Sequence, residues 1–304
     1  MNHNVKDNKG KKKYGFVILH YLAYDMTVEC ISKLLDKFEK YDMHIVIVDN
    51  ASRNQSGKKL QEKYLKESLV TVIENTENLG FAKGNNVGYQ YLTDRYDMDY
   101  IIVMNNDILI EQKEFLDLID KIYLEQPFDV LGPDIYCPKI QMHQNPSREK
   151  GLTKEELLEL QESKCHFLSH PMYYYFRHMT LGKVKKVLKK DRSARRPDYT
   201  SNSQSSVLHG ACYIFSKNYM RLRKNCFNPK TFMYMEEDIL YYECVRDGLR
   251  MHYDPRIRVQ HLEDVSTDAS IGSGLKKQVM KNTEMLKSME VLLNLMDKIG
   301  RAHV

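Results

Sequence analysis

Several features that mark other protein classes are missing from this chain of 304 residues. Tryptophan is absent, although tyrosine is abundant with 21 residues. No stretch approaches the ~20 consecutive apolar residues that cross a bilayer. The polar N-terminus MNHNVKDNKGKKK lacks the apolar core of a secretory signal, and Lys9 to Lys13 predict a solvated tail. We therefore expect a cytoplasmic protein.

Paired cysteines are also missing. Six cysteines are scattered along the chain, none in a Cys-x-x-Cys pair: Cys30, Cys137, Cys165, Cys212, Cys226 and Cys244. This scatter indicates reduced thiols and speaks against a zinc site. With 42% hydrophobic and 29% charged residues and a net charge of +5, the composition is that of an ordinary globular protein. The length fits one large α/β domain or two small ones.

Short apolar runs alternate with helical patterns in the first half of the chain. Runs of β-forming residues predict buried strands over 14–20, 43–48, 70–75 and 100–107. Helical spacing of apolar residues predicts helices over 26–40, 58–65 and 113–125. The alternation predicts a parallel sheet with helices on both faces, in which ligands bind beyond the carboxyl ends of the strands. Asp49, the glycine-rich run 78–88 and Asp107 all fall at that edge.

The second half is less regular. We predict a capped helix over 153–163, a strand over 207–215, a helix over 237–247 ending at Gly248, a strand pair over 250–261 and an amphipathic helix over 276–299. For the last helix we expect packing on the domain, with dimer formation as the alternative.

Asn105-Asn106-Asp107 directly follows an apolar strand. A carboxylate at a strand tip can hold Mg²⁺ or Mn²⁺, which prefer oxygen ligands, and the metal would bridge a diphosphate. Taken alone, the segment favours an ordinary polar turn, because Asn and Asp are common turn residues. His261 follows a later predicted strand and is a metal ligand only if it faces the same crevice.

Glu236-Glu237-Asp238 opens a predicted helix. Carboxylates stabilise a helix N-terminus, but three in a row exceed what a cap requires. One of them can act as a general base toward an attacking hydroxyl. The glycine-rich run 78–88 matches neither the dinucleotide nor the phosphate-loop fingerprint. It is either a tight turn before a helix or a close backbone approach to a nucleotide.

Together and in this order, the segments resemble family 2 glycosyltransferases, specifically the rhamnosyltransferase-like branch that builds bacterial polysaccharides. The resemblance covers roughly residues 14–135 and 206–267. It implies a GT-A fold, an α/β architecture with a Rossmann-like, mostly parallel sheet flanked by helices, here with a helical insertion and a C-terminal helix. It also implies metal-dependent, inverting transfer from a UDP- or dTDP-sugar, with Mn²⁺ or Mg²⁺ as cofactor.

The resemblance also assigns roles to single residues. Binding of the nucleotide-sugar is assigned to His20, Tyr21, Asp49, Asn50, Ser52, Asn78, Gly80, Phe81, Gly84, Asn85, Asn106 and Asp107. His20 departs from the family, which often has Asn there. Asp107 and His261 are assigned to the metal, and His209-Gly210-Ala211 to the acceptor side.

Phe232 to Asp238 resembles the segment that carries the catalytic base. Counting back from Arg246-Asp247-Gly248 favours Glu237, although a register slip of one residue would make Asp238 the base. Glu236 is the third candidate. The base would deprotonate an acceptor hydroxyl, which attacks opposite the leaving nucleoside diphosphate, while the metal neutralises the charge that builds there.

These assignments divide the chain into five segments. They are the disordered tail 1–13, the nucleotide-sugar-binding half 14–142, a helical and basic insertion 143–205, the acceptor-binding and catalytic half 206–268, and the C-terminal amphipathic helix 269–304. No family motif falls in the insertion. Its run 172–196 is either a solvated helical excursion or a contact with anionic lipid at the inner face of the cell membrane, with Tyr173 to Phe176 at the interface and Lys183, Lys185, Lys186, Lys189 and Lys190 outside.

The predicted function is therefore transfer of a hexose or rhamnose to a glycan acceptor, which we expect to be lipid-linked, in cell-surface polysaccharide synthesis. One alternative is a nucleotidyltransferase, although the first strand leads into HYLAYDMT rather than a Gly-rich, Lys-containing signature. Another is a non-catalytic nucleotide- or polysaccharide-binding protein on the same fold. Nucleic acid is not an expected partner, because no binding fold accompanies the basic run.

Overall fold

The computed structural model describes residues 11–174, 197–263 and 274–300. The strands are β1 (Lys13–His20), β2 (Asp42–Asp49), β3 (Val70–Glu74), β4 (Tyr100–Asn105), β5 (Ile108–Leu109), β6 (Val130–Cys137), β7 (Met142–His143), β8 (Ser203–Gln204), β9 (Cys212–Ser216) and β10 (Met251–His261). The main helices are α1 (Tyr24–Lys37), α2 (Ser56–Tyr64), α3 (Gly80–Arg95), α4 (Phe115–Glu125), α5 (Lys154–Ser169), α7 (Lys217–Leu222), α8 (Glu236–Arg246) and α10 (Leu275–Gly300).

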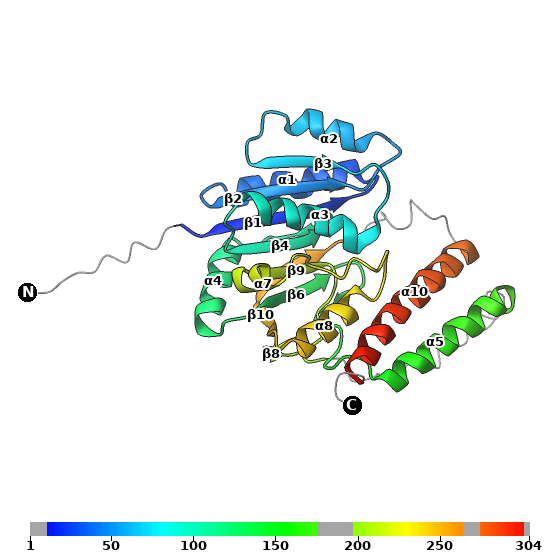
Figure 1. Cartoon of the computed structure of the whole chain (residues 1–304). Coiled ribbons are helices and arrows are strands. Elements are labelled where there is room, and N and C mark those ends of the chain that lie inside the picture. Colours follow the sequence, from blue (N-terminus) through cyan, green and yellow to red (C-terminus); the bar gives the residue numbers. More distant parts are fainter. Residues whose placement is uncertain (1–10, 175–196, 264–273, 301–304) are drawn as a thin grey trace, which may run out of the picture.

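A single mixed sheet forms the centre of the molecule (Figure 1). Its strand order is β3-β2-β1-β4-β9-β6-β10-β5, with β7 added to β6 and β8 to β10. The first four strands in this order are parallel, as the alternating sequence pattern predicts. Strand β9 runs antiparallel to both β4 and β6, so the sheet is not parallel throughout.

Alternate residues of β1 pack on opposite faces of the sheet, as the two-residue period of a strand requires. Tyr14, Phe16 and Ile18 belong to the core beneath α1, α2 and α4. Val17 belongs to the other core, beneath α3, α7 and α8. The result is a three-layer arrangement in which helices cover both faces of the sheet.

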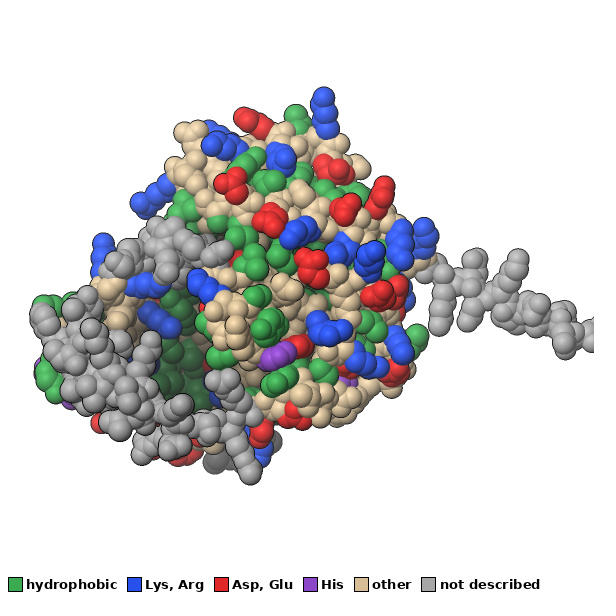
Figure 2. Space-filling model, turned by 180° about the vertical axis from the view of Figure 1, so that it is seen from behind, with side chains coloured by type: hydrophobic (Ala, Val, Ile, Leu, Met, Phe, Trp, Pro, Cys, Tyr) green, Lys and Arg blue, Asp and Glu red, His purple; other side chains and the backbone are tan. Residues whose placement is uncertain are grey.

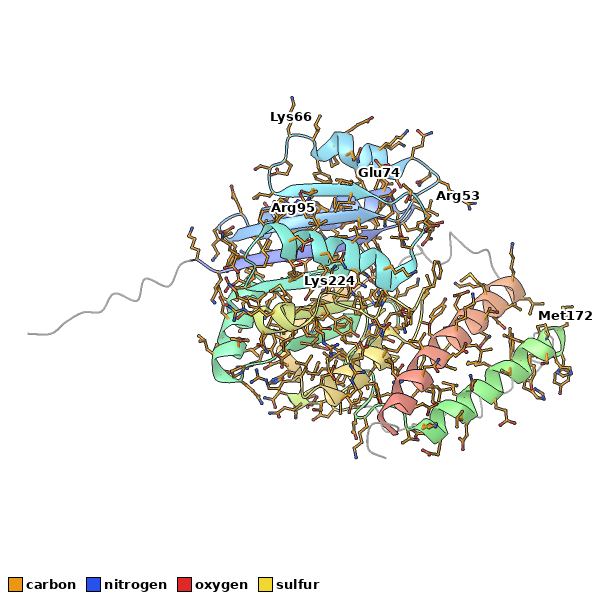
Figure 3. The ribbon with its side chains drawn as sticks, in the orientation of Figure 1. Arg53, Lys66, Glu74, Arg95, Met172 and Lys224 are labelled. Carbon is orange, nitrogen blue, oxygen red and sulfur yellow. The ribbon has the colours of Figure 1, made fainter. Side chains whose placement is uncertain are left out.

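Helices α5 and α10 lie side by side at one flank of the sheet, away from these layers (Figure 1). Leu157 of α5 packs with Met289 and Leu292 of α10 and with Ile239 of α8 in a third apolar cluster. A capping box at Thr153 begins α5, as its sequence predicts. The C-terminal helix thus packs on the rest of the chain, and Met172 lies exposed at the outer end of the pair (Figure 3).

Four sequence predictions need correction. The run 78–88 is not a turn before a helix, because α3 begins at Gly80 and includes most of the run. Residues 250–261 form one strand, β10, with a register shift between Asp254 and Arg258, and not a strand pair. The strand predicted over 207–215 begins only at Cys212. Lys12 and Lys13 belong to the folded domain, because Lys13 opens β1 and both residues hydrogen-bond Asp99.

The surface seen from behind carries Lys and Arg side chains interspersed with Asp and Glu, and a hollow with hydrophobic side chains opens in it (Figure 2). Most of the predicted lipid-contact run lies outside the described residues, including Phe176 and the five lysines from Lys183 to Lys190. Within the described ranges, no helix combines the length and apolar content needed to cross a membrane.

Candidate active site

A cavity of about 470 Å³ lies at the carboxyl edge of the parallel strands, where the sequence predicts ligand binding. It is lined by Leu19, Tyr21, Asn50, Asn78, Gly80, Phe81, Asn105, Asn106, Asp107, His209, Gly210, Ala211, Phe232, Met233, Tyr234, Glu236, Glu237 and Met280. Twelve of these residues are among the site residues predicted from the sequence. Segments far apart in the chain therefore meet here.

Asp107 and His261 come together because β5 pairs antiparallel with β10, which places Ile108 opposite His261. Asp107 Oδ1 lies 3.4 Å from His261 Nε2. The other ring nitrogen of His261 is 2.7 Å from Gln144 Oε1, a contact that fixes the ring. Asp107 Oδ1 is buried and has no hydrogen-bond partner among the described residues.

This pair is suited to a divalent metal. A buried carboxylate oxygen without a donor partner, beside an imidazole held by a second hydrogen bond, is a typical arrangement of metal ligands. In the described part of the chain, no group of three or more His, Cys, Asp and Glu side chains is arranged to hold a metal ion. An ion at Asp107 and His261 would therefore take its other ligands from a bound diphosphate and from water.

His209 lies between this pair and the acidic helix start. Its ring packs edge to face on His261, with 5.9 Å between the ring centroids. Nδ1 accepts a hydrogen bond from the backbone N–H of Ala211, so the proton of the neutral ring is on Nε2. Burial lowers the pKa of His209, against the opposing charge of Glu237.

The three consecutive carboxylates at the start of α8 have different surroundings. Glu237 lines the cavity, and its Oε1 accepts a hydrogen bond from the backbone N–H of Gly210 at 3.1 Å. Glu236 lines it too. Asp238 points elsewhere, forms an ion pair with Arg148 and lines a second cavity. Its position does not support a register in which Asp238 is the base.

A strained turn directly before α8 orients these side chains. Tyr234 and Met235, directly before α8, both have left-handed backbones, with φ of 72° and 66°. Such residues cost about 1–3 kcal/mol each and persist where the surroundings hold them. Here the N–H of Phe81 donates to Phe232 O at 2.7 Å, and Ser288 of α10 donates to Met233 O at 3.2 Å. Helices α3 and α10 thus fix the turn.

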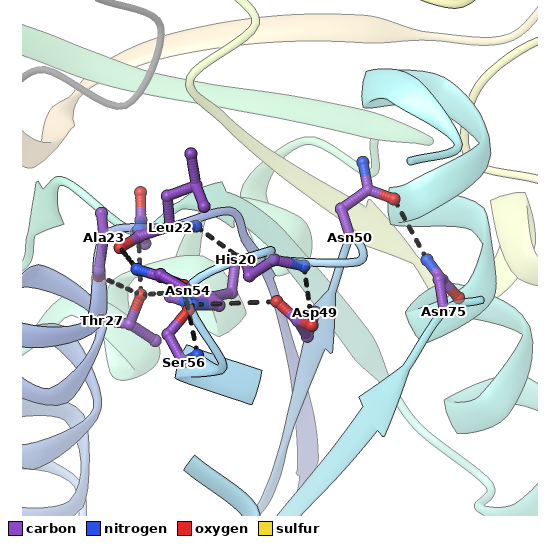
Figure 4. A network of polar contacts seen from close by, with 11 residues as sticks. His20, Leu22, Ala23, Thr27, Asp49, Asn50, Asn54, Ser56 and Asn75 are labelled. Carbon is purple, nitrogen blue, oxygen red and sulfur yellow. Dashed lines mark hydrogen bonds and ion pairs between the residues drawn. The ribbon is translucent and has the colours of Figure 1, made fainter. Parts of the chain in front are cut away.

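The predicted contacts His20, Asp49 and Ser52 lie behind the cavity wall and form a polar network (Figure 4). His20 is fully buried, and its two ring nitrogens lie 2.7 Å from the hydroxyls of Thr27 and Ser56. Burial lowers the pKa of His20 to about 4, against the opposing charge of Asp49. In these positions they support the loops around the cavity, and none of the three lines it.

Asn50 lines the cavity on the side of α3. Its amide donates to Asn78 Oδ1 and to the carbonyl of Gly80, and it accepts from Asn75 and from the N–H of Leu79. These bonds join the end of β2 to the segment 75–80, which leads from the end of β3 into α3.

Gly84 and Asn85 also lie outside the cavity wall. A side chain at Gly84 would come within 2.6 Å of Leu19, and Asn85 is buried with its amide bonded to Phe81 O. Both residues pack α3 onto the sheet.

Sequence reasoning missed the wall residues Leu19 and Met280, and also Gln144, which holds His261 from outside the wall. Leu19 is part of an ordinary buried strand, and Met280 is one of many apolar positions on α10. Neither has a signal of its own in the sequence. Their roles depend on tertiary packing.

Comparisons with known proteins agree with this arrangement. The family described as glycosyl transferase family 2 matches residues 16–187, which is more than half of the chain. The hexosyltransferase Agl10 of low-salt glycan biosynthesis in Haloferax volcanii is 21% identical over 207 residues, covering 68% of this chain and 54% of that protein. The chain thus spans about half the length of this curated relative.

The fold is also shared with a solved structure. GalNAc-T7, crystallised with UDP, GalNAc and Mn²⁺, superposes with a TM-score of 0.53 at 13% identity, covering 88% of this chain and 47% of the other. This likeness supports a GT-A fold, as the sequence resemblance implied. With a GT-A fold, a cavity at the predicted edge of the sheet and a family match over residues 16–187, the chain belongs to glycosyl transferase family 2.

Proposed function

We propose that this glycosyltransferase moves a hexosyl or rhamnosyl unit from a UDP- or dTDP-sugar to a glycan acceptor, with inversion at the anomeric carbon and with a divalent metal. One observation carries the proposal. Glu237, His209 and Asp107 line the same cavity, and His261 lies 3.4 Å from Asp107 and packs on the His209 ring. A candidate base and a candidate metal ligand therefore share one cavity, as transfer from a metal-bound nucleoside diphosphate requires.

In the proposed reaction, Glu237 accepts the proton of the acceptor hydroxyl as that oxygen attacks the anomeric carbon. The bond between this carbon and the diphosphate oxygen breaks, and the nucleoside diphosphate leaves. A bound Mn²⁺ or Mg²⁺ would supply positive charge to the departing diphosphate. Asp107 and His261 would hold that ion, while the N–H of Gly210 orients the carboxylate of Glu237 at 3.1 Å.

The two substrates are assigned to opposite walls. Tyr21, Asn50, Asn78 and the start of α3 would contact the nucleotide, because they lie at the carboxyl ends of the parallel strands. The turn His209-Gly210-Ala211 and the segment from Phe232 would contact the acceptor. The name of the Haloferax relative, a hexosyltransferase of glycan biosynthesis, supports a glycan acceptor. The lipid-linked acceptor and the bacterial polysaccharide pathway stay predictions of the sequence resemblance.

Replacing the proposed base tests this function. We expect Glu237→Gln to lower transfer by ~100-fold or more, because the general base is lost, while metal-dependent nucleotide binding remains. Asp238→Asn is the matched control, since Asp238 pairs with Arg148 outside this cavity. It should cost about 1–3 kcal/mol of unfolding free energy and leave the turnover of the folded enzyme largely intact.

Turnover is measured as release of nucleoside diphosphate from the nucleotide-sugar with the acceptor present. A loss of turnover in Asp238→Asn with an active Glu237→Gln would overturn the assignment of the base. Wild-type protein that binds nucleotides but never turns over a nucleotide-sugar would favour a binding protein on the same fold.

A further inference from the structure

The proposed reaction does not use Glu236, although this carboxyl is part of the same cavity. Glu236 is only 7% exposed, it lines the cavity, and its Oε1 has no hydrogen-bond partner among the described residues. Burying an ionised carboxylate without a full set of partners is costly. A buried carboxyl at a cavity wall, with one oxygen that lacks a partner, therefore favours either a proton or a ligand on the carboxyl.

One negative charge and several hydrogen-bonding groups act on Glu236. Glu237 lies next to it in the chain, and the hydroxyl of Thr231 hydrogen-bonds it. Tyr213 of β9 and Tyr234 also interact with it electrostatically. From α10, Glu284 acts on Tyr234, and the ammonium of Lys281 stands over the Tyr234 ring at 5.5 Å. Burial raises the pKa of Glu236 to about 7, with hydrogen bonds opposing the rise and the charge of Glu237 adding to it.

We propose that Glu236 is a substrate-binding carboxyl that acts as a neutral acid, with its O–H donating a hydrogen bond to a hydroxyl of the transferred sugar, while Glu237 is the base. The inference rests on the proposed function. A carboxylic acid offers one donor and further acceptor sites, which matches a sugar hydroxyl.

The charge balance of the cavity supports a neutral Glu236. The bound diphosphate brings several negative charges to a site that already contains Asp107 and Glu237. A third ionised carboxylate would repel the diphosphate, whereas a protonated one would not. Two neighbouring carboxyls with different protonation states allow one to bind while the other accepts a proton.

The first test is the pH profile of kcat/KM for sugar transfer. We expect wild-type activity to fall as the pH rises through about 7, because Glu236 loses the proton that it donates to the sugar. Glu236→Gln retains a neutral donor, so this fall should disappear while the activity below that pH stays within ~10-fold of wild type. Glu236→Leu removes the donor and should lose ~10- to 100-fold below that pH, with a smaller loss relative to wild type above it.

Glu290→Gln, on the exposed side of α10, is the control and should reproduce the wild-type profile. A Glu236→Gln variant as inactive as Glu237→Gln would overturn the inference, because Glu236 would then be the base. A fall in activity near pH 7 that persists unchanged in Glu236→Gln would overturn it as well.

A second measurement needs no activity and so separates this inference from the proposed function. Folding raises the pKa of Glu236 from 4.5 to about 7, so the unfolded chain ionises first and wild-type stability falls as the pH rises between these values. Glu236→Gln lacks this fall. We expect the variant to gain melting temperature relative to wild type at about pH 8, with a smaller difference at about pH 5. An identical difference at both pH values would contradict a protonated Glu236.

Discussion

The wall of the cavity built by β1, β2 and α3 differs from the wall built by β9 and α8 in how its polar side chains are bonded. On the first wall, the amide of Asn50 makes four hydrogen bonds within the protein, and both ring nitrogens of His20 contact hydroxyls. On the second wall and beside it, Glu236 and Asp107 each have a buried oxygen with no hydrogen-bond partner among the described residues, and behind the first wall the same holds for one oxygen of Asp49.

This difference distinguishes side chains that support the shape of the cavity from side chains that are available to bind a ligand. Side chains that bond each other fix the shape of a site before any ligand arrives. Buried oxygens that lack a partner retain their bonding capacity for a ligand, a metal or a proton. Substitutions on the first wall should therefore lower stability, whereas substitutions of the free carboxyls should change binding and turnover with little loss of stability.

The largest effect on stability is expected for Asn50→Ala. The substitution leaves the carbonyl of Gly80, the N–H of Leu79 and two asparagine side chains without their partner. We expect a loss of about 2–4 kcal/mol of unfolding free energy, measured by urea denaturation. Asn294→Ala, exposed on α10, is the matched control and should change stability by less than about 0.5 kcal/mol. A loss below about 1 kcal/mol at Asn50 would remove the contrast between the walls.

A much smaller effect on stability is expected for Asp107→Asn. Oδ1 has no hydrogen-bond donor among the described residues, with His261 Nε2 at 3.4 Å, and the N–H of Leu262 bonds the backbone carbonyl of Asp107, which the substitution keeps. Stability should change by less than about 1 kcal/mol. Metal-dependent nucleotide binding, followed by calorimetry, should weaken by ~10-fold or more, because a charged metal ligand is lost. Unchanged binding would exclude Asp107 from the metal site, and a large loss of stability would give it a structural role instead.

The sequence predicted the parts of the fold that depend on local pattern. The four parallel strands follow from their apolar runs. The polar residues that flank these patterns predict Asp49 and Asp107 at the carboxyl ends of the strands and the start of α8 at the acidic run. The approach of His261 to Asp107 depends on the pairing of β5 with β10, two segments about 150 residues apart, which no local pattern shows.

Glycine and proline account for most errors of the sequence reading. Gly84 and Gly88 stand inside α3 although glycine disfavours helices, because added side chains would come within 2.6 Å of Leu19 and Val17 on β1. Pro255 lies in β10, where the register shift removes the need for its missing donor. Strand β6 contains Gly132-Pro133-Asp134 and so resembles a turn, and the sequence analysis did not predict it. Close packing overrode the local preference of Gly84 and Gly88, whereas a register shift accommodates Pro255.

The central claim is that the cavity binds a nucleoside diphosphate together with a metal. It is tested most directly by the melting temperature of the wild-type protein with UDP, dTDP, GDP or CMP, each in Mn²⁺, Mg²⁺ or EDTA. A ligand at ~100 times its dissociation constant adds ~2.7 kcal/mol to the free energy of unfolding, which a melting curve resolves. We predict stabilisation by UDP or dTDP that depends on the metal and is lost in EDTA. No stabilisation by any of the four nucleotides, with either metal, would contradict the claim.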